Sequence, residues 1–248
     1  MFSVDINPIL FKIGFLEIRY YGLVYVLGVL LTYYYLKRKK VLGENELDRL
    51  MLYLTAGMFI GARLFGIISQ GFFILFKDPL EFFRIWNGGM SFFGGFLGGL
   101  IGSYIVLKKK IFYIGDFVVV PVSFALILGR LTNFVNQELV GRITDVSWCI
   151  NFSTASGCRH PYQLYAAFSH LLIFLFLLFM SKRNYRRGEI FWGFVAGYGL
   201  MRFATDFFRE NPVILGLTGW QWASILFFII GIYYLRKIRG NLSDLQAR

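Results

Sequence analysis

Seven apolar stretches separated by clusters of Lys and Arg constrain this chain more than any other feature of its sequence. A helix that crosses a membrane needs roughly 20 predominantly apolar residues. Only 16% of the residues are charged, against about a quarter in soluble domains, so we expect an all-α integral membrane protein with about seven transmembrane helices. The expected spans are 18–36, 50–70, 91–107, 112–131, 161–181, 190–208 and 219–236.

The basic clusters set the expected orientation. Loops that stay in the cytoplasm carry an excess of Lys and Arg, which places the N-terminus outside, the C-terminus in the cytoplasm, and outer loops near 71–90, 132–160 and 209–218. The net charge of +12 is spread over several loops, whereas a nucleic-acid surface gathers it on one face, so no nucleic-acid partner is expected. The clusters are Lys37–Lys40, Lys108–Lys110, Lys182–Arg187 and Arg236–Arg239.

No internal repeat, linker or cleavable signal peptide is evident, and we expect a single transmembrane domain over residues 1–248, as a monomer. Cys149 and Cys158 lie in the longest outer loop, where they form either a disulfide or two free thiols. Together with His160 they leave a zinc site one ligand short, so no metal is expected. Four tryptophans fall near the expected outer ends, as interfacial residues do: Trp86, Trp148, Trp220 and Trp222.

Three arginines interrupt the apolar spans: Arg63, Arg130 and Arg202. A cation at mid-membrane depth costs at least ~2.5–3.5 kcal/mol. Such a residue therefore faces a protein interior, a water-filled cavity or an anionic ligand, and in a bilayer the nearest anion is a phospholipid phosphate.

The stretch GRLTNFVNQELVGR (129–142) is typical of a helix that leaves the membrane on the outer side. At about 100° per residue, one helical face would carry Arg130, Asn133, Gln137 and Gly141. A cation, two amides and a residue without a side chain suit a phosphate or glycerol headgroup. Glu138 lies to one side and could pair with an arginine. The alternative is a buried polar network that only holds helices together.

The stretch YGLMRFATDFFREN (198–211) repeats this pattern, because Arg202, Asp206 and Arg209 fall on one helical face. Asp206 could orient both guanidinium groups and leave their far sides free for an anion. The alternative is an internal salt bridge without a ligand.

Glycine pairs mark the segment 88–99. Gly94-Gly95 and Gly98-Gly99 are typical of close helix packing, whereas Gly88-Gly89, where the loop enters the membrane, could line a headgroup pocket.

Two histidines and one tyrosine could carry chemistry. His160 stands at the mouth of a span, where it could act as a general base or an orienting donor. His170, inside an apolar stretch, is expected to be a satisfied buried polar group. Tyr21 is either an interfacial anchor or a hydroxyl directed into a cavity.

Five motifs together resemble the bacterial prolipoprotein diacylglyceryl transferase family, in the family's order and over nearly the whole chain. They are RYYGLVY (19–25), GGMSFFGG (88–95), GRLTNFVNQELVGR (129–142), RHPYQLY (159–165) and YGLMRFATDFFRE (198–210). The resemblance implies seven spans with an outer N-terminus, in the bacterial cytoplasmic (inner) membrane.

The resemblance also implies the reaction and its partners. These enzymes transfer the diacylglyceryl group of phosphatidylglycerol to the lipobox cysteine of a preprolipoprotein signal peptide, forming a thioether and releasing glycerol phosphate, without a cofactor. This is the first step of lipoprotein maturation. The catalytic residues then expected are Arg130, Arg202, Tyr21, Glu138 and His160. The residues expected to bind phosphatidylglycerol are Arg130, Asn133, Gly141, Arg202, Arg209, Asp206 and Gly89.

The chain departs from the family's pattern at three positions. Phe93 stands where the family has a histidine after GGMSF, Ala166 where a Glu is usual, and Asp206 at a usual Glu position. Because phenylalanine cannot accept a proton, the thiol's proton acceptor is open among substrate phosphate, Glu138, His160 and water. The departures also leave an alternative function, a divergent paralogue that binds phospholipid or lipoprotein precursors without transfer.

Overall fold

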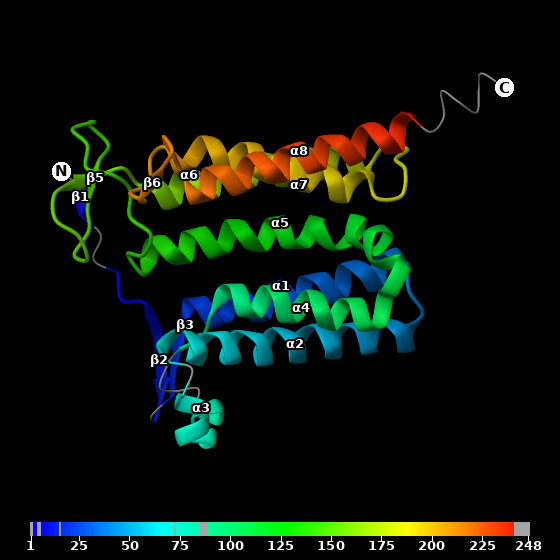
Figure 1. Ribbon diagram of the computed structural model, residues 1–248, viewed down its shortest axis with the longest axis horizontal. Coiled ribbons are helices and arrows are strands. Elements are labelled where there is room, and N and C mark those ends of the chain that lie inside the picture. The colour runs from blue at the N-terminus through cyan, green and yellow to red at the C-terminus, as the bar shows by residue number, and fades with distance from the viewer. Residues whose placement is uncertain (1, 4–5, 15, 72, 85–88, 241–248) are drawn as a thin grey trace. The chain divides into compact units, whose positions relative to one another are not determined.

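The computed structural model describes residues 2–3, 6–14, 16–71, 73–84 and 89–240 (Figure 1). Trp86, Gly88 and the expected cytoplasmic tail beyond residue 240 lie outside the described residues.

Every predicted apolar stretch is a helix, and the ends agree within a few residues except that α2 begins six residues early. The long helices are α1 (Tyr20–Lys39), α2 (Glu44–Gln70), α4 (Phe92–Leu107), α5 (Ile111–Val135), α6 (Tyr162–Ser181), α7 (Glu189–Asp206) and α8 (Gly219–Gly240). By length and composition, three helical stretches could cross a membrane: Glu44–Gln70, Phe93–Val135, which contains α4 and α5, and Tyr162–Ser181. The protein is thus mostly helical, with several candidate spans.

Short strands, which the all-α prediction does not include, lie before and between the helices. β1 (Phe2–Ser3) pairs with β4 (Ile150–Asn151), and β4 pairs with β5 (Cys158–Arg159). Two hairpins join β2 (Ile9–Ile13) to β3 (Leu16–Arg19) and β6 (Val213–Ile214) to β7 (Leu217–Thr218). Strands of two to five residues are too short for alternation to reveal them. The described residues also form three short helical turns: α3 (Ile74–Lys77), η1 (Pro79–Phe83) and η3 (Lys108–Lys110).

The chain forms two compact units, residues 29–114 (the α2–α4 unit) and residues 1–28 with 115–248 (the α5–α8 unit). In the α2–α4 unit, glycines bring the two helix backbones into contact. A Cβ added at Gly98 would meet the carbonyl oxygen of Gly57, and one at Gly94 would meet that of Gly61. The predicted packing role of the second and third glycine pairs is thereby confirmed for Gly94 and Gly98.

Arg63, in the same unit, is satisfied by the protein itself. The side chain is 1% exposed. Its Nε donates to the Phe82 carbonyl at 3.0 Å and its Nη2 to the Arg84 carbonyl at 2.9 Å, and it forms an ion pair with Glu81 at 3.2 Å. Of the three options for a buried cation, Arg63 therefore takes the protein interior and holds η1.

In the α5–α8 unit, α6, α7 and α8 lie side by side (Figure 1). The ends next to the basic clusters are fastened by carboxylates. Asp116 of α5 accepts from the backbone N–H of Gly188 at 2.5 Å and of Phe191 at 2.8 Å, which satisfies the N-terminus of α7. Glu189 pairs with Arg239 of α8 at 2.6 Å. These contacts fix α5, α7 and α8 at one end and leave the other end for the arginines.

Candidate active site

Helix α5 ends at Val135, well before the predicted exit at residue 142. Gln137 and Leu139 both have φ of 54°, which an α-helix cannot contain. The predicted four-residue face is therefore wrong beyond Asn133. Gln137 instead accepts from the backbone N–H of Ser153 at 2.6 Å and so holds the loop between α5 and α6.

Arg130 begins a chain of hydrogen bonds at the end of α5. Its Nη1 donates to Asn133 Oδ1 at 3.3 Å, and Asn133 Nδ2 donates to Glu138 Oε2 at 3.0 Å. The other Glu138 oxygen accepts from Asn136 at 3.3 Å. The expected pairing of Glu138 with an arginine is not found among the described residues, because both carboxylate oxygens are taken by amides. Within that part of the chain, Arg130 forms no ion pair with a carboxylate.

The predicted pair of Arg202 and Asp206 is confirmed. Asp206 is fully buried, and its Oδ1 lies 3.1 Å from Arg202 Nη2. The carboxylate also accepts from the Thr218 hydroxyl and from Asn211 Nδ2 at 3.1 Å. Arg202 Nη1 donates to the hydroxyl of Tyr162. Asp206 therefore fixes Arg202 while tying the end of α7 to the loop before α8.

Arg209 lies just past the end of α7 and is not paired with Asp206 among the described residues, so the prediction that Asp206 orients both guanidinium groups is wrong for Arg209. Its guanidinium carbon is 5.7 Å from the centre of the Tyr162 ring, and that of Arg202 is 5.8 Å from the same centre. Burial lowers the pKa of Arg209, and the positive charges of Arg202 and Arg130 act in the same direction, whereas Tyr162 and the Asp206 carboxylate act against them. The charges of Arg130, Arg202 and Arg209 thus act on one region, and of these three only Arg202 forms a described ion pair, with Asp206. Such an excess of positive charge favours an anionic ligand.

His160 and Gly141 lie in the loop between α5 and α6, at the border of this region. The His160 ring packs edge-on against Phe208 at 5.2 Å, and its Nδ1 lies 3.2 Å from the Tyr165 hydroxyl. Burial lowers the pKa of His160, which favours the neutral imidazole. At Gly141 an added Cβ would meet the carbonyl oxygens of His160 and Phe208. The close approach predicted at Gly141 is therefore made by the protein's own backbone.

The loop between α5 and α6 contains a disulfide between Cys149 and Cys158, whose Cα atoms are 5.5 Å apart. The alternative of two free thiols does not hold.

Tyr21 and Gly89 have their described contacts elsewhere. Tyr21, in the first turn of α1, packs edge-on against Tyr25 at 5.3 Å. Gly89 belongs to the α2–α4 unit and has φ of 74°, and a Cβ there would meet Gln70 Nε2 and, at 3.3 Å, Arg63 Nη1. Neither residue shares a described contact with Arg130 or Arg202.

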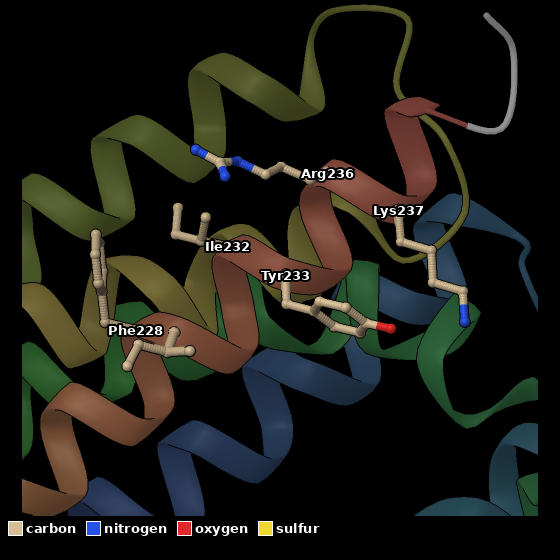
Figure 2. A pocket seen from close by; sticks show the side chains of 6 residues that line it. Phe228, Ile232, Tyr233, Arg236 and Lys237 are labelled. Atoms are coloured by element: carbon tan, nitrogen blue, oxygen red, sulfur yellow. The ribbon is translucent and has the colours of Figure 1, made fainter.

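A hollow of about 470 Å³ lies along the far end of α8, and Figure 2 shows the side chains around it. Trp220, at the start of α8, lies 5.6 Å from the Arg202 guanidinium. The residues around the hollow begin at Phe228, eight residues later, so the hollow starts roughly 12 Å along the helix from Trp220 and extends away from Arg202. It is therefore separate from the candidate site. The residues around it are Phe228, Ile229, Ile232, Tyr233, Arg236 and Lys237.

Residues 8–236 match the family model of prolipoprotein diacylglyceryl transferase. The chain belongs to the prolipoprotein diacylglyceryl transferase family. Three curated relatives are each named phosphatidylglycerol–prolipoprotein diacylglyceryl transferase. The protein of Geobacter sulfurreducens is 40% identical, over 86% of this chain and 85% of the relative. That of Ehrlichia ruminantium strain Gardel is 35% identical, over 95% of this chain and 98% of the relative. That of Vibrio cholerae is 36% identical, over 92% of this chain and 90% of the relative.

Sequence reasoning about this diacylglyceryl transferase missed three residues that line the arginine region from α6. They are Tyr162, Gln163 and His170. Tyr162 and Gln163 belong to the RHPYQLY motif, so the motif itself carried a signal for them. His170 gave none, because one histidine within an apolar helix is equally compatible with a packing role.

Proposed function

We infer that this protein is a phosphatidylglycerol–prolipoprotein diacylglyceryl transferase. It moves the diacylglyceryl group of phosphatidylglycerol to the lipobox cysteine of a prolipoprotein, which is the first step of lipoprotein maturation. A C–S bond forms at the glyceryl carbon, the C–O bond to phosphate breaks, and glycerol phosphate leaves with that electron pair. The alternative of a paralogue that only binds is not favoured, because the arginine region is retained.

The observation that carries the catalytic proposal is the meeting of Arg202 and Arg209 at the Tyr162 ring, in a region that the charge of Arg130 also reaches. Negative charge grows on the leaving phosphate during the displacement, and fixed cations in a site of low dielectric stabilise it. Arg202 is held by Asp206, and Arg130 is held by Asn133, so both are positioned before the substrate arrives. Arg209 adds a third cation to the headgroup region.

The proton of the lipobox thiol needs an acceptor, since Phe93 replaces the usual histidine. Glu138 is a weak candidate because both of its oxygens accept amide hydrogen bonds. A neutral His160 at the outer border of the site suits the task better, with Tyr165 orienting its ring. Tyr21 and Gly141 are proposed to shape the pocket for phosphatidylglycerol.

We also propose that all seven long helices cross the cytoplasmic membrane as one domain. The basic clusters lie between or after helices at alternate ends, which supports an outer N-terminus and a cytoplasmic C-terminus. The disulfide supports an outer position for loop 136–161, because disulfides persist in oxidising compartments. In α7, Arg202 and Asp206 lower the hydropathy, but they pair with each other inside the protein.

The experiment measures glycerol phosphate release and thioether formation with a lipobox peptide in phosphatidylglycerol vesicles. Arg130→Gln and Arg202→Gln should each lower the rate at least about a hundredfold, the size expected when a donor to developing charge is removed. Arg236→Gln is the matched control, since it removes the same charge from the exposed hollow on α8 (Figure 2). A wild type without glycerol phosphate release contradicts the function, and equal losses in all three variants contradict the site.

A further inference from the structure

His170 is a buried side chain with one ring nitrogen paired and the other without a partner. It lies on α6 and is 4% exposed. Its Nε2 accepts from Arg130 Nε at 3.4 Å, and its ring stacks on Tyr198 at 5.6 Å. Among the described residues, its buried Nδ1 has no hydrogen-bond partner. The expectation of a satisfied polar group therefore fails for half of the ring.

The contact with Arg130 determines which ring nitrogen carries the proton. An arginine N–H can only donate, so Nε2 must hold its lone pair toward Arg130. In the neutral imidazole the proton is then on Nδ1. Two positive charges, those of Arg130 and Arg202, act on this ring. The unpartnered atom is thus an N–H donor beside the arginines, and leaving a buried donor unpaired costs free energy. A ligand oxygen would remove that cost.

The position of His170 along α6 indicates which ligand oxygen this is. α6 begins at Tyr162, whose hydroxyl contacts Arg202. His170 is eight residues further along, which places its backbone roughly 12 Å deeper from the outer end. If the arginines hold the phosphate of a phospholipid, the groups that follow toward the bilayer centre are the glycerol carbons and their acyl ester carbonyls.

A second unpartnered atom on the same face of α6 supports this direction. Gln163 is seven residues before His170, so both side chains lie on one side of the helix. Gln163 Nε2 donates to the Glu138 carbonyl at 2.6 Å, whereas its buried Oε1 has no partner in the part of the chain that the structure describes. An acceptor at the outer end suits the hydroxyl groups of a glycerol headgroup, and a donor deeper in the helix suits an ester oxygen.

We propose that His170 is a substrate-positioning residue, in which Nε2 orients the Arg130 guanidinium and Nδ1–H binds an acyl ester carbonyl of the diacylglyceryl group. The inference rests on the proposed function and deepens it. His170 would then favour lipids with ester-linked chains by binding the acyl ester carbonyl, a group that does not react.

The test compares phosphatidylglycerol with ester-linked chains and the same lipid with ether-linked chains, which lack the carbonyl acceptor. The wild type should use the ester lipid with a kcat/KM roughly two- to tenfold higher, the range for one neutral hydrogen bond. His170→Phe keeps the stacking on Tyr198 but has no donor, so the ester/ether ratio should fall to about one. His170→Asn places an amide N–H near the Nδ1 position and should restore the preference.

The controls separate the possible failures. Ser169→Ala removes a buried hydroxyl that bonds only to the Ala166 carbonyl, at 2.8 Å, and should leave the ratio at the wild-type value. A wild type without an ester preference, or a His170→Phe variant that loses the same factor on both lipids, overturns the inference while the transferase function stands. A wild type that releases glycerol phosphate from neither lipid overturns the function itself.

Discussion

At the scale of single residues, Asp206 carries the greatest structural demand in the site. Its buried carboxylate serves Arg202, Thr218 and Asn211 together. Removing one member of a buried ion pair strands the other charge and typically costs about 3–5 kcal/mol. We therefore expect Asp206→Ala to lower the unfolding temperature in detergent markedly and to abolish transfer. Asn211→Ala removes one partner of Asp206 and leaves the ion pair, so it should lower the unfolding temperature much less. Equal decreases for the two variants would contradict this prediction.

Residue-level prediction from the sequence succeeded where spacing alone fixes proximity. Arg202 and Asp206, four apart on a helix, meet as expected. It failed where the backbone leaves the helix, since the positive φ of Gln137 and Leu139 rotates the chain after Asn133. It also failed for Glu138, because the choice between arginine and amide partners depends on which side chains the fold brings near.

At the scale of helices, the backbone contact between α2 and α4 gives a prediction with opposite signs at neighbouring glycines. A Cβ at Gly98 would collide with the Gly57 carbonyl, whereas one at Gly95 would meet Ala62 Cβ and the Met58 carbonyl at 3.4 Å, an ordinary contact. Gly98→Ala should therefore lower the free energy of unfolding by about 1–3 kcal/mol, because the added methyl group overpacks the contact. Gly95→Ala should be neutral or stabilising, because alanine favours the helix. Thermal unfolding in detergent decides, and a Gly98→Ala variant as stable as wild type would contradict the close approach.

The helices themselves were predictable because apolar runs of span length and basic clusters are dictated by the bilayer. The short strands and the early start of α2 at Glu44 were not, since they depend on local hydrogen bonds rather than on burial in lipid. Arg63 shows the same limit. Its partners lie in η1 and at the residue just after it, and no periodicity in the sequence predicts this turn.

At the scale of the whole molecule, the proposed topology and the disulfide can be tested together in spheroplasts. If Cys149 and Cys158 are bonded in an outer loop, a membrane-impermeant maleimide should label the protein only after an impermeant reductant has been added. Lys109→Cys, made in a background with both native cysteines replaced by serine, should stay unlabelled until the membrane is permeabilised, since its basic cluster is expected inside. Labelling without reductant would refute the disulfide. Labelling of the Lys109→Cys variant from outside, or none of the native pair after reduction, would invert the topology and move the arginines away from the leaflet in which prolipoproteins present their cysteine.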